Sequence, residues 1–74
     1  MDKITNQIRR LRFEHGEMTQ QQLAEKIQLT RQTVNAIEQG KYSPSLEAAF
    51  RIAAVFGVPL ESVFHYTESK DEDE

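Results

Sequence analysis

The segment from Thr19 to Glu38 contains two short amphipathic patterns, separated by too few residues for one straight helix. Thr19 and Gln22 match a capping box, in which the Thr hydroxyl accepts from the Gln22 backbone amide and the Gln side chain returns a bond. A helix is therefore expected to begin near Gln20. Its apolar positions form one stripe at Leu23, Ala24 and Ile27.

A second helix is expected to follow almost at once. The first apolar stripe stops at Gln28, Thr30 is a favoured N-cap residue, and apolar positions resume at Val34 and Ile37. Two helices joined by a turn of about three or four residues must cross at a steep angle. The small side chain of Ala24 lets the two axes approach. The segment therefore predicts a helix-turn-helix corner.

The polar side chains of the second helix are concentrated near its start. Arg31, Gln32, Thr33 and Asn35 lie away from the apolar stripe. Arginine can bind guanine O6 and N7 with two hydrogen bonds, and glutamine or asparagine can do the same to adenine. Such a helix enters the major groove of DNA by its N-terminal end. The pattern favours Arg31, Gln32 and Asn35 as base-reading residues, with an ordinary solvent-facing helix as the alternative.

Length and composition narrow the class of protein. The 74 residues suffice for one small domain, and the absence of cysteine excludes disulfides and cysteine-based zinc sites. No apolar run approaches the roughly 20 residues of a membrane span, and no secretion signal is recognisable. A cytoplasmic protein is expected.

The acidic net charge of -3 belongs to the end of the chain. Residues 1–60 contain eight Lys or Arg and six acidic residues, whereas residues 61–74 contain Lys70 and six acidic residues. We therefore expect a DNA-binding domain over residues 1–66 and an acidic, disordered tail over 67–74. An alternative role for the tail is to repel DNA and so reduce nonspecific binding.

The remaining pattern predicts an all-α fold of five helical segments. A first helix is expected from about Thr5 to Glu14, and a final short turn after Pro59. Between the corner and that turn, a long helix is expected to follow the N-cap Ser45 and end at Gly57. Its apolar stripe is Leu46, Ala49, Ile52, Ala53 and Phe56. The residues from Val63 to Tyr66 are the one segment suited to an edge strand.

Taken together, these residues resemble the Cro and phage-repressor type of helix-turn-helix regulators, also called the xenobiotic-response-element (XRE) family. The resemblance spans about Asn6 to Tyr66, and the chain is especially similar to short stand-alone members of the family. The matching residues are Thr19-Gln20, Leu23-Ala24, Thr30 to Val34, Ile37-Glu38, Gly40 to Tyr42, Pro44 to Leu46, Ile52-Ala53 and Leu60 to Phe64. The resemblance implies a compact, lambda-repressor-like DNA-binding domain.

The resemblance also implies roles for individual residues. Arg12 and Glu38 match a structural salt bridge, and Ala36 occupies a position where some relatives carry a base-reading glutamine. Gln28 stands where the motif commonly has glycine, so a left-handed backbone is expected there. The residues expected to contact the DNA backbone are Thr19, Gln20, Thr33, Lys41, Tyr42 and Ser43.

A single recognition helix reads only a few base pairs, so a homodimer on a palindromic operator is expected. The candidate interface consists of Leu60, Val63, Phe64 and Tyr66, with packing inside the monomer as the alternative for Leu60 and Val63. The function predicted from the sequence is a sequence-specific DNA-binding regulator, more specifically a repressor. The alternative is a protein-interaction module, such as an antitoxin-like subunit.

Catalytic chemistry is not indicated. His15 and His65 have no carboxylate partner recognisable by spacing, and the three glycines are too scattered for a phosphate-binding loop. No serine lies in a nucleophile-elbow context. We therefore expect no enzyme activity, no metal site and no cofactor.

Overall fold

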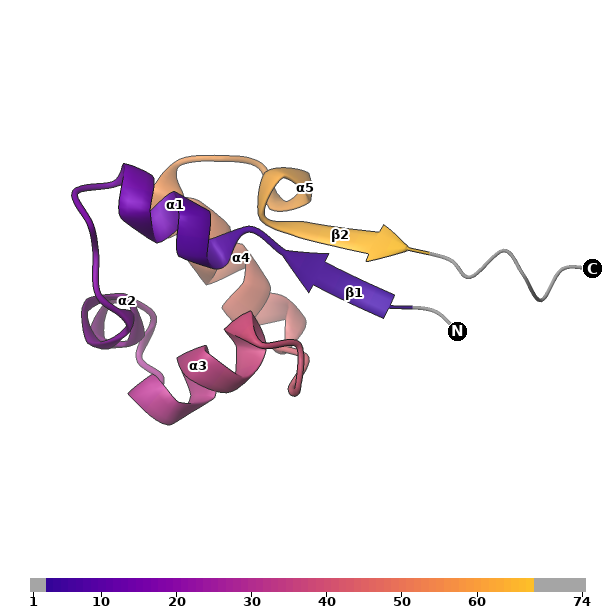
Figure 1. Ribbon diagram of the computed structural model, residues 1–74, viewed down its shortest axis with the longest axis horizontal. Coiled ribbons are helices and arrows are strands. Elements are labelled where there is room, and N and C mark those ends of the chain that lie inside the picture. Colours follow the sequence, from indigo (N-terminus) through magenta and orange to yellow (C-terminus); the bar gives the residue numbers. More distant parts are fainter. Residues whose placement is uncertain (1–2, 68–74) are drawn as a thin grey trace, which may run out of the picture.

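The computed structural model describes residues 3–67, which form five helices and a small antiparallel sheet (Figure 1). In chain order the elements are β1 (Lys3–Asn6), α1 (Ile8–Glu14), α2 (Gln20–Ile27), α3 (Arg31–Glu38), α4 (Leu46–Phe56), α5 (Leu60–Val63) and β2 (Phe64–Thr67). The predicted, mostly helical fold is confirmed, and the structure adds a small two-stranded sheet to it. The predicted acidic tail, apart from Thr67, lies outside the described residues.

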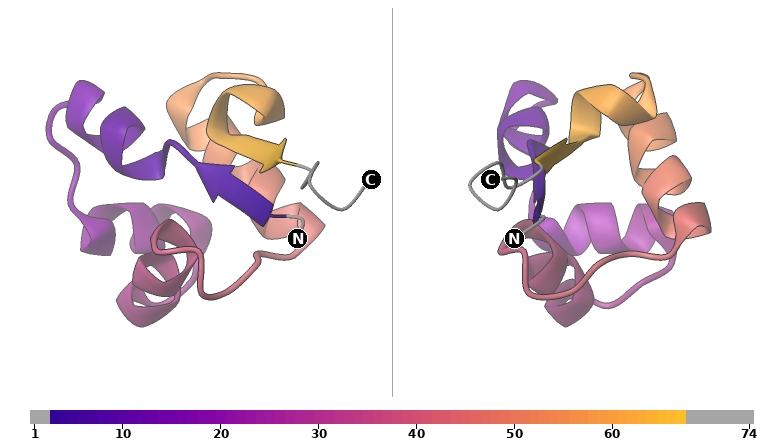
Figure 2. Two further views of the ribbon diagram at one scale, coloured as in Figure 1. Left: turned by 45° about the vertical axis from the view of Figure 1, so that its right-hand side comes forward. Right: turned by 90° about the vertical axis from the view of Figure 1, so that its right-hand side faces the viewer.

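The sheet joins the two ends of the described chain (Figure 2). In β1 and β2, Ile4 lies opposite Tyr66, and Asn6 lies opposite Phe64. The predicted edge strand begins one residue later than expected. Helix α1 begins later than the predicted Thr5, because Thr5 and Asn6 belong to β1.

The start of α1 follows from the side chain of Asn6. Its Oδ1 accepts a hydrogen bond from the backbone amide of Ile8 at 3.1 Å. Ile8 has no exposed surface, so the hydrogen bond from its amide joins the end of β1 to a residue of the core. The helix therefore begins at Ile8 rather than at Thr5.

One hydrophobic core lies between the helices. It consists of Ile8, Leu11, Leu23, Ala24, Ile27, Val34, Ile37, Ile52, Ala53, Phe56 and Val63. Among residues 3–67, no polar or charged residue is buried, and no helix is both long and apolar enough to cross a membrane. Folding therefore depends on the packing of apolar helix faces against one another.

Helix α4 matches the predicted bounds but not the whole predicted stripe. Ser45 Oγ accepts from the Ala48 amide at 3.1 Å, and Gly57 ends the helix with φ 67°. Leu46, however, is 70% exposed, and Phe50 is 54% exposed. Apolar spacing identifies side chains on one helix face, but it does not show how far the facing core extends. The first turns of α4 therefore carry apolar side chains at the surface.

Candidate nucleic-acid interface

The corner between α2 and α3 is built by the residues that predicted it. Thr19 Oγ1 accepts from the Gln22 amide at 3.0 Å, and Gln22 Oε1 accepts from the Thr19 amide at 2.8 Å. Gln28 then turns the chain with a left-handed backbone, and Thr30 Oγ1 caps α3 through the Thr33 amide at 3.1 Å. The capping box and the left-handed Gln28 are both as expected.

Helix α3 turns one face to the core and another to solvent. Val34 and Ile37 are buried, whereas Arg31 and Gln32 are exposed and Asn35 is partly exposed. Arg31 and Gln32 lie in the first turn, directly after the Thr30 cap. The three predicted base-reading residues therefore share the accessible side of this helix, together with the partly exposed Thr33 and Ala36.

A nearly buried ion pair ties α1 to the end of α3. Arg12 Nε donates to Glu38 Oε2 at 2.6 Å, and Arg12 Nη2 donates to Glu38 Oε1 at 3.1 Å. Arg12 Nη1 also donates to the backbone oxygen of Met18 at 2.7 Å. The two side chains are only 15% and 8% exposed. A fork-shaped pair of this kind fixes the angle between two helices because both hydrogen bonds are directional.

Gln20 connects this ion pair to the exposed face of α3. Its Nε2 group donates to Glu38 Oε1 at 3.2 Å and to Asn35 Oδ1 at 3.0 Å, and its Oε1 accepts a long contact from Arg31 Nη1 at 3.5 Å. Asn35 Oδ1 also accepts from Gln39 at 3.3 Å. Within the described residues, Asn35 therefore retains its Nδ2 group for donation to a base. A two-bond contact with adenine requires one of these Oδ1 bonds to break.

The loop that follows α3 leaves the helix through a Schellman turn. Gly40 has φ 76°, a conformation that suits glycine, and its amide donates to the Ile37 oxygen at 3.0 Å. The Lys41 amide donates to the Ala36 oxygen at 2.9 Å. Lys41, Tyr42 and Ser43 are exposed directly after this turn. The predicted backbone-contact residues of the loop therefore lie beside the end of α3.

Asn6 is a residue of the site that sequence reasoning did not identify. Its Nδ2 group donates to the backbone oxygens of Ile37 at 3.0 Å and Glu38 at 3.4 Å. Its Oδ1 accepts from the Ile8 amide at the start of α1. Asn6 therefore holds the sheet, α1 and α3 together. The only local signal is that asparagine is a common residue before a helix, and this signal says nothing about α3.

The predicted dimer-interface residues divide into two groups. Val63 has no exposed surface and packs inside the monomer, which was the alternative expected for this residue. Leu60 and Phe64 are partly buried against the same core, and Tyr66 is 61% exposed. The structure thus leaves Leu60, Phe64 and Tyr66 with accessible surface.

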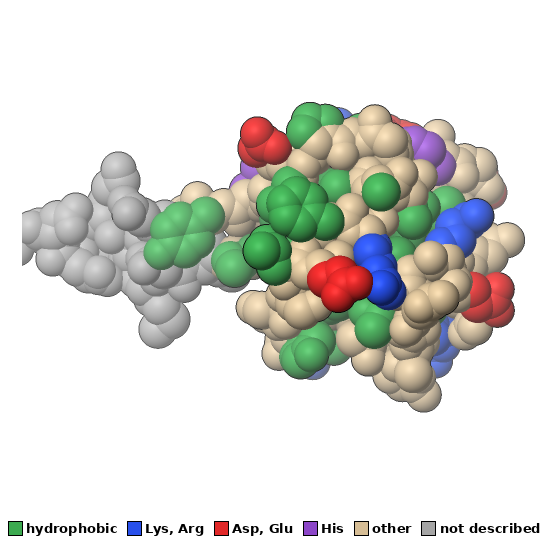
Figure 3. All heavy atoms as spheres, turned by 180° about the vertical axis from the view of Figure 1, so that it is seen from behind, with side chains coloured by type: hydrophobic (Ala, Val, Ile, Leu, Met, Phe, Trp, Pro, Cys, Tyr) green, Lys and Arg blue, Asp and Glu red, His purple; other side chains and the backbone are tan. Residues whose placement is uncertain are grey.

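Additional apolar side chains extend that surface. Ile4, Leu46, Leu60 and Phe64 line one hollow, and Ile4, Phe64 and Tyr66 line a neighbouring one. We call Ile4, Leu46, Leu60, Phe64 and Tyr66 the apolar face. Figure 3, which shows the molecule from behind, has several hydrophobic side chains at the surface of the domain.

Other potential sites are sparse. His15 packs on Phe56 with a ring-centroid distance of 5.1 Å and contacts the backbone oxygens of Leu11 and Phe56. His15 therefore has a structural role at the end of α1. Among the described residues, no group of three or more His, Cys, Asp or Glu side chains is placed to hold a metal ion.

Known proteins share this sequence pattern. The chain matches the Helix-turn-helix family over residues 8–63. It is 46% identical over 67 residues to an uncharacterised HTH-type transcriptional regulator of Methanocaldococcus jannaschii, covering 90% of this chain and 100% of that one. It is 43% identical over 65 residues to the uncharacterised HTH-type transcriptional regulator YgzD of Bacillus subtilis, covering 88% and 97%.

The fold is also found in a solved structure. A candidate DNA-binding protein from Bacteroides fragilis matches with a TM-score of 0.72 and 21% sequence identity, over 84% of this chain and 98% of that one. This similarity concerns the fold alone. The sequence matches, by contrast, identify the family: the chain belongs to the XRE-type helix-turn-helix regulators.

Proposed function

We propose that this protein is a sequence-specific DNA-binding repressor that recognises its operator through α3. The observation that carries the proposal is the exposed start of α3, where Arg31 and Gln32 stand on a helix held by a nearly buried ion pair and by Gln20. A rigidly held helix with exposed hydrogen-bonding side chains is suited to reading base edges in the major groove.

In this proposal base reading and backbone binding are divided between residues. Arg31 and Gln32 read bases directly, and Asn35 contributes through its Nδ2 group. Contacts with phosphates set the position of α3 but carry no sequence information themselves. The residues assigned to them are Thr19, Gln20, Thr33, Lys41, Tyr42 and Ser43.

We further propose that two copies bind a palindromic operator. One recognition helix covers too few base pairs for high specificity, and a twofold dimer places two such helices about 34 Å apart. The apolar face supports this part of the proposal because two of its members, Leu46 and Tyr66, are 70% and 61% exposed. A compact dimer on DNA represses by excluding polymerase, which requires no further domain.

The double substitution Arg31→Ala, Gln32→Ala tests the proposed site. It should abolish the preference for operator over unrelated duplex while leaving thermal unfolding nearly unchanged, because both side chains are exposed. Fluorescence anisotropy with the two duplexes measures this preference. Arg10→Ala is the charge-matched control for the arginine, since Arg10 pairs with Glu14 on the surface of α1. Unchanged operator preference in the double variant would show that Arg31 and Gln32 do not read the bases, whereas the alternative, a protein-interaction module, should keep its protein partner in the double variant.

A further inference from the structure

Helix α1 carries three arginines that differ in their partners. Arg12 binds Glu38, and Arg10 Nε donates to Glu14 Oε2 at 3.2 Å. Arg9 is exposed, and it makes no hydrogen bond or ion pair with any described residue. Within residues 3–67, two of these arginines therefore have carboxylate partners and the third has none.

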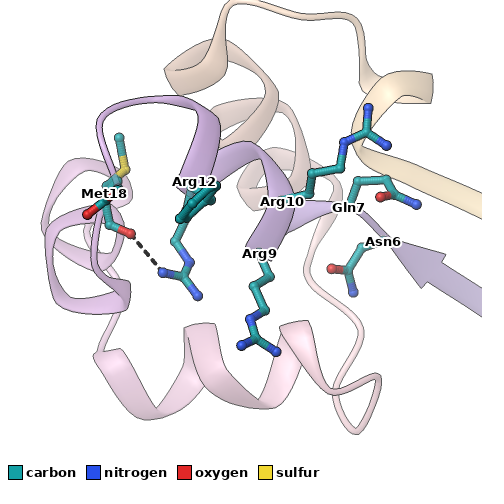
Figure 4. Close-up of a pocket in the computed structure, with 8 residues that line it drawn as sticks. Asn6, Gln7, Arg9, Arg10, Arg12 and Met18 are labelled. Carbon is teal, nitrogen blue, oxygen red and sulfur yellow. Dashed lines mark hydrogen bonds between the residues drawn. The ribbon is translucent and has the colours of Figure 1, made fainter.

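The position of Arg9 relative to α3 is set by its neighbours on both sides. Asn6, three residues earlier, bonds to the backbone at the end of α3, and Arg12, three residues later, bonds to the Glu38 side chain. Arg9 and Arg12 are three residues apart within α1 and so share one side of this helix, the side from which Arg12 reaches Glu38 of α3. In Figure 4 the Arg9 side chain extends towards the α3 ribbon, whereas Arg10 extends away from it.

Among the described residues, no carboxylate forms an ion pair with Arg9. Both oxygens of Glu38 already accept hydrogen bonds from Arg12, and Oε1 also accepts from Gln20. Glu17 lines the same hollow as Arg9, but no ion pair joins the two. A guanidinium that has no ion-pair partner in the described part of the chain can bind an anion without first breaking a bond to that part.

We propose that Arg9 binds a phosphate of the DNA backbone alongside α3, an inference that rests on the proposed DNA-binding function. Arginine suits this task because its planar group can donate two parallel hydrogen bonds to phosphate oxygens. A contact made from α1, beside α3 rather than from it, reaches the DNA backbone and leaves the base edges to α3. Arg9 thus adds a basic residue from a third helix to the backbone contacts assigned to α2, α3 and the following loop.

The substitution Arg9→Gln tests this inference against Arg10→Gln, the same change one residue along the helix. Binding is measured by anisotropy over a series of salt concentrations, with two duplexes of about 20 base pairs: a selected operator and a mixed sequence. Arg9→Gln should weaken binding to both duplexes by a similar factor, roughly 3- to 10-fold, and lower the salt slope by about 0.9 per protomer. Arg9→Lys should keep most of that slope.

The controls separate the possible failures. Arg10→Gln should change the slope much less, and thermal unfolding should be unaltered in both variants because neither side chain is buried. If Arg9→Gln matches wild type or Arg10→Gln in slope and affinity, the inference is wrong and the proposed function stands. If the wild-type protein shows no salt-dependent DNA binding at all, the proposed function fails and the inference falls with it.

Discussion

Gln28 has a left-handed backbone where α2 ends, with φ 63° and ψ 40°. In this region a Cβ atom lies too close to the neighbouring backbone, so a residue other than glycine is strained. Gln28 is exposed, so its side chain gains no packing energy from the core. The turn between the two motif helices therefore carries a local energetic cost.

Replacing Gln28 by glycine should remove that cost. The expected gain in unfolding free energy is about 0.5 to 1 kcal/mol, because relief of strain is partly offset by the greater freedom of glycine in the unfolded chain. Thermal melting should rise by a few degrees, on the order of 5 °C at most. Gln39→Gly is the matched control, since Gln39 has φ -86° and should give no gain. A lower melting temperature for Gln28→Gly would contradict the strained turn.

At the scale of helices and strands, local signals predicted the starts of α2, α3 and α4. Thr19, Thr30 and Ser45 each cap the helix that follows, and capping depends only on neighbours a few residues away. Strand β1 was not predicted because its four residues are too few to show a period, and its partner is at the other end of the chain. The contact of Asn6 with α3 escaped prediction for the same reason.

The candidate site was predictable to a similar extent. The exposure of Arg31 and Gln32 follows from helical spacing alone. The pairing of Arg12 with Glu38 was implied by family resemblance, because nothing local links residues so far apart in the chain. That Arg9 has no carboxylate partner among residues 3–67 became clear only from the ion pairs of the neighbouring arginines.

The ion pair between α1 and α3 should contribute measurably to stability. Glu38→Gln leaves the guanidinium of Arg12, which is 15% exposed, without a carboxylate. We expect a loss of about 2 to 3 kcal/mol in unfolding free energy, somewhat below the cost of breaking a fully buried pair. Urea unfolding measures it. Glu47→Gln is the matched control, because the Arg51–Glu47 pair has the same 2.6 Å distance but side chains that are 45% and 74% exposed.

That surface pair should be worth less than about 1 kcal/mol. Equal losses in Glu38→Gln and Glu47→Gln would show that burial does not strengthen the link between α1 and α3. Adding Arg12→Met to Glu38→Gln should cost less than the sum of the two single changes, because the two residues share one interaction.

At the scale of the whole molecule, Leu46 of the apolar face is 70% exposed, so the described part of the monomer leaves most of its side chain uncovered. A dimer formed through this face should dissociate when a charge is placed on it, because burying an unpaired carboxylate is costly. We expect Leu46→Glu to shift sedimentation at micromolar concentration from dimer to monomer. Phe13→Glu is the control: Phe13 is 68% exposed, close to the 70% of Leu46, but lies on α1 outside the apolar face. Dimers that survive Leu46→Glu would exclude Leu46 from the interface.

Symmetric reading of DNA by two copies of α3 is the main function proposed for this protein. Selection of bound duplexes from a random library tests it most directly, because one experiment reports specificity, symmetry and spacing. We expect a palindromic consensus whose half-sites are centred about 10 base pairs, one helical turn, apart. Failure of the wild-type protein to enrich any sequence would contradict it.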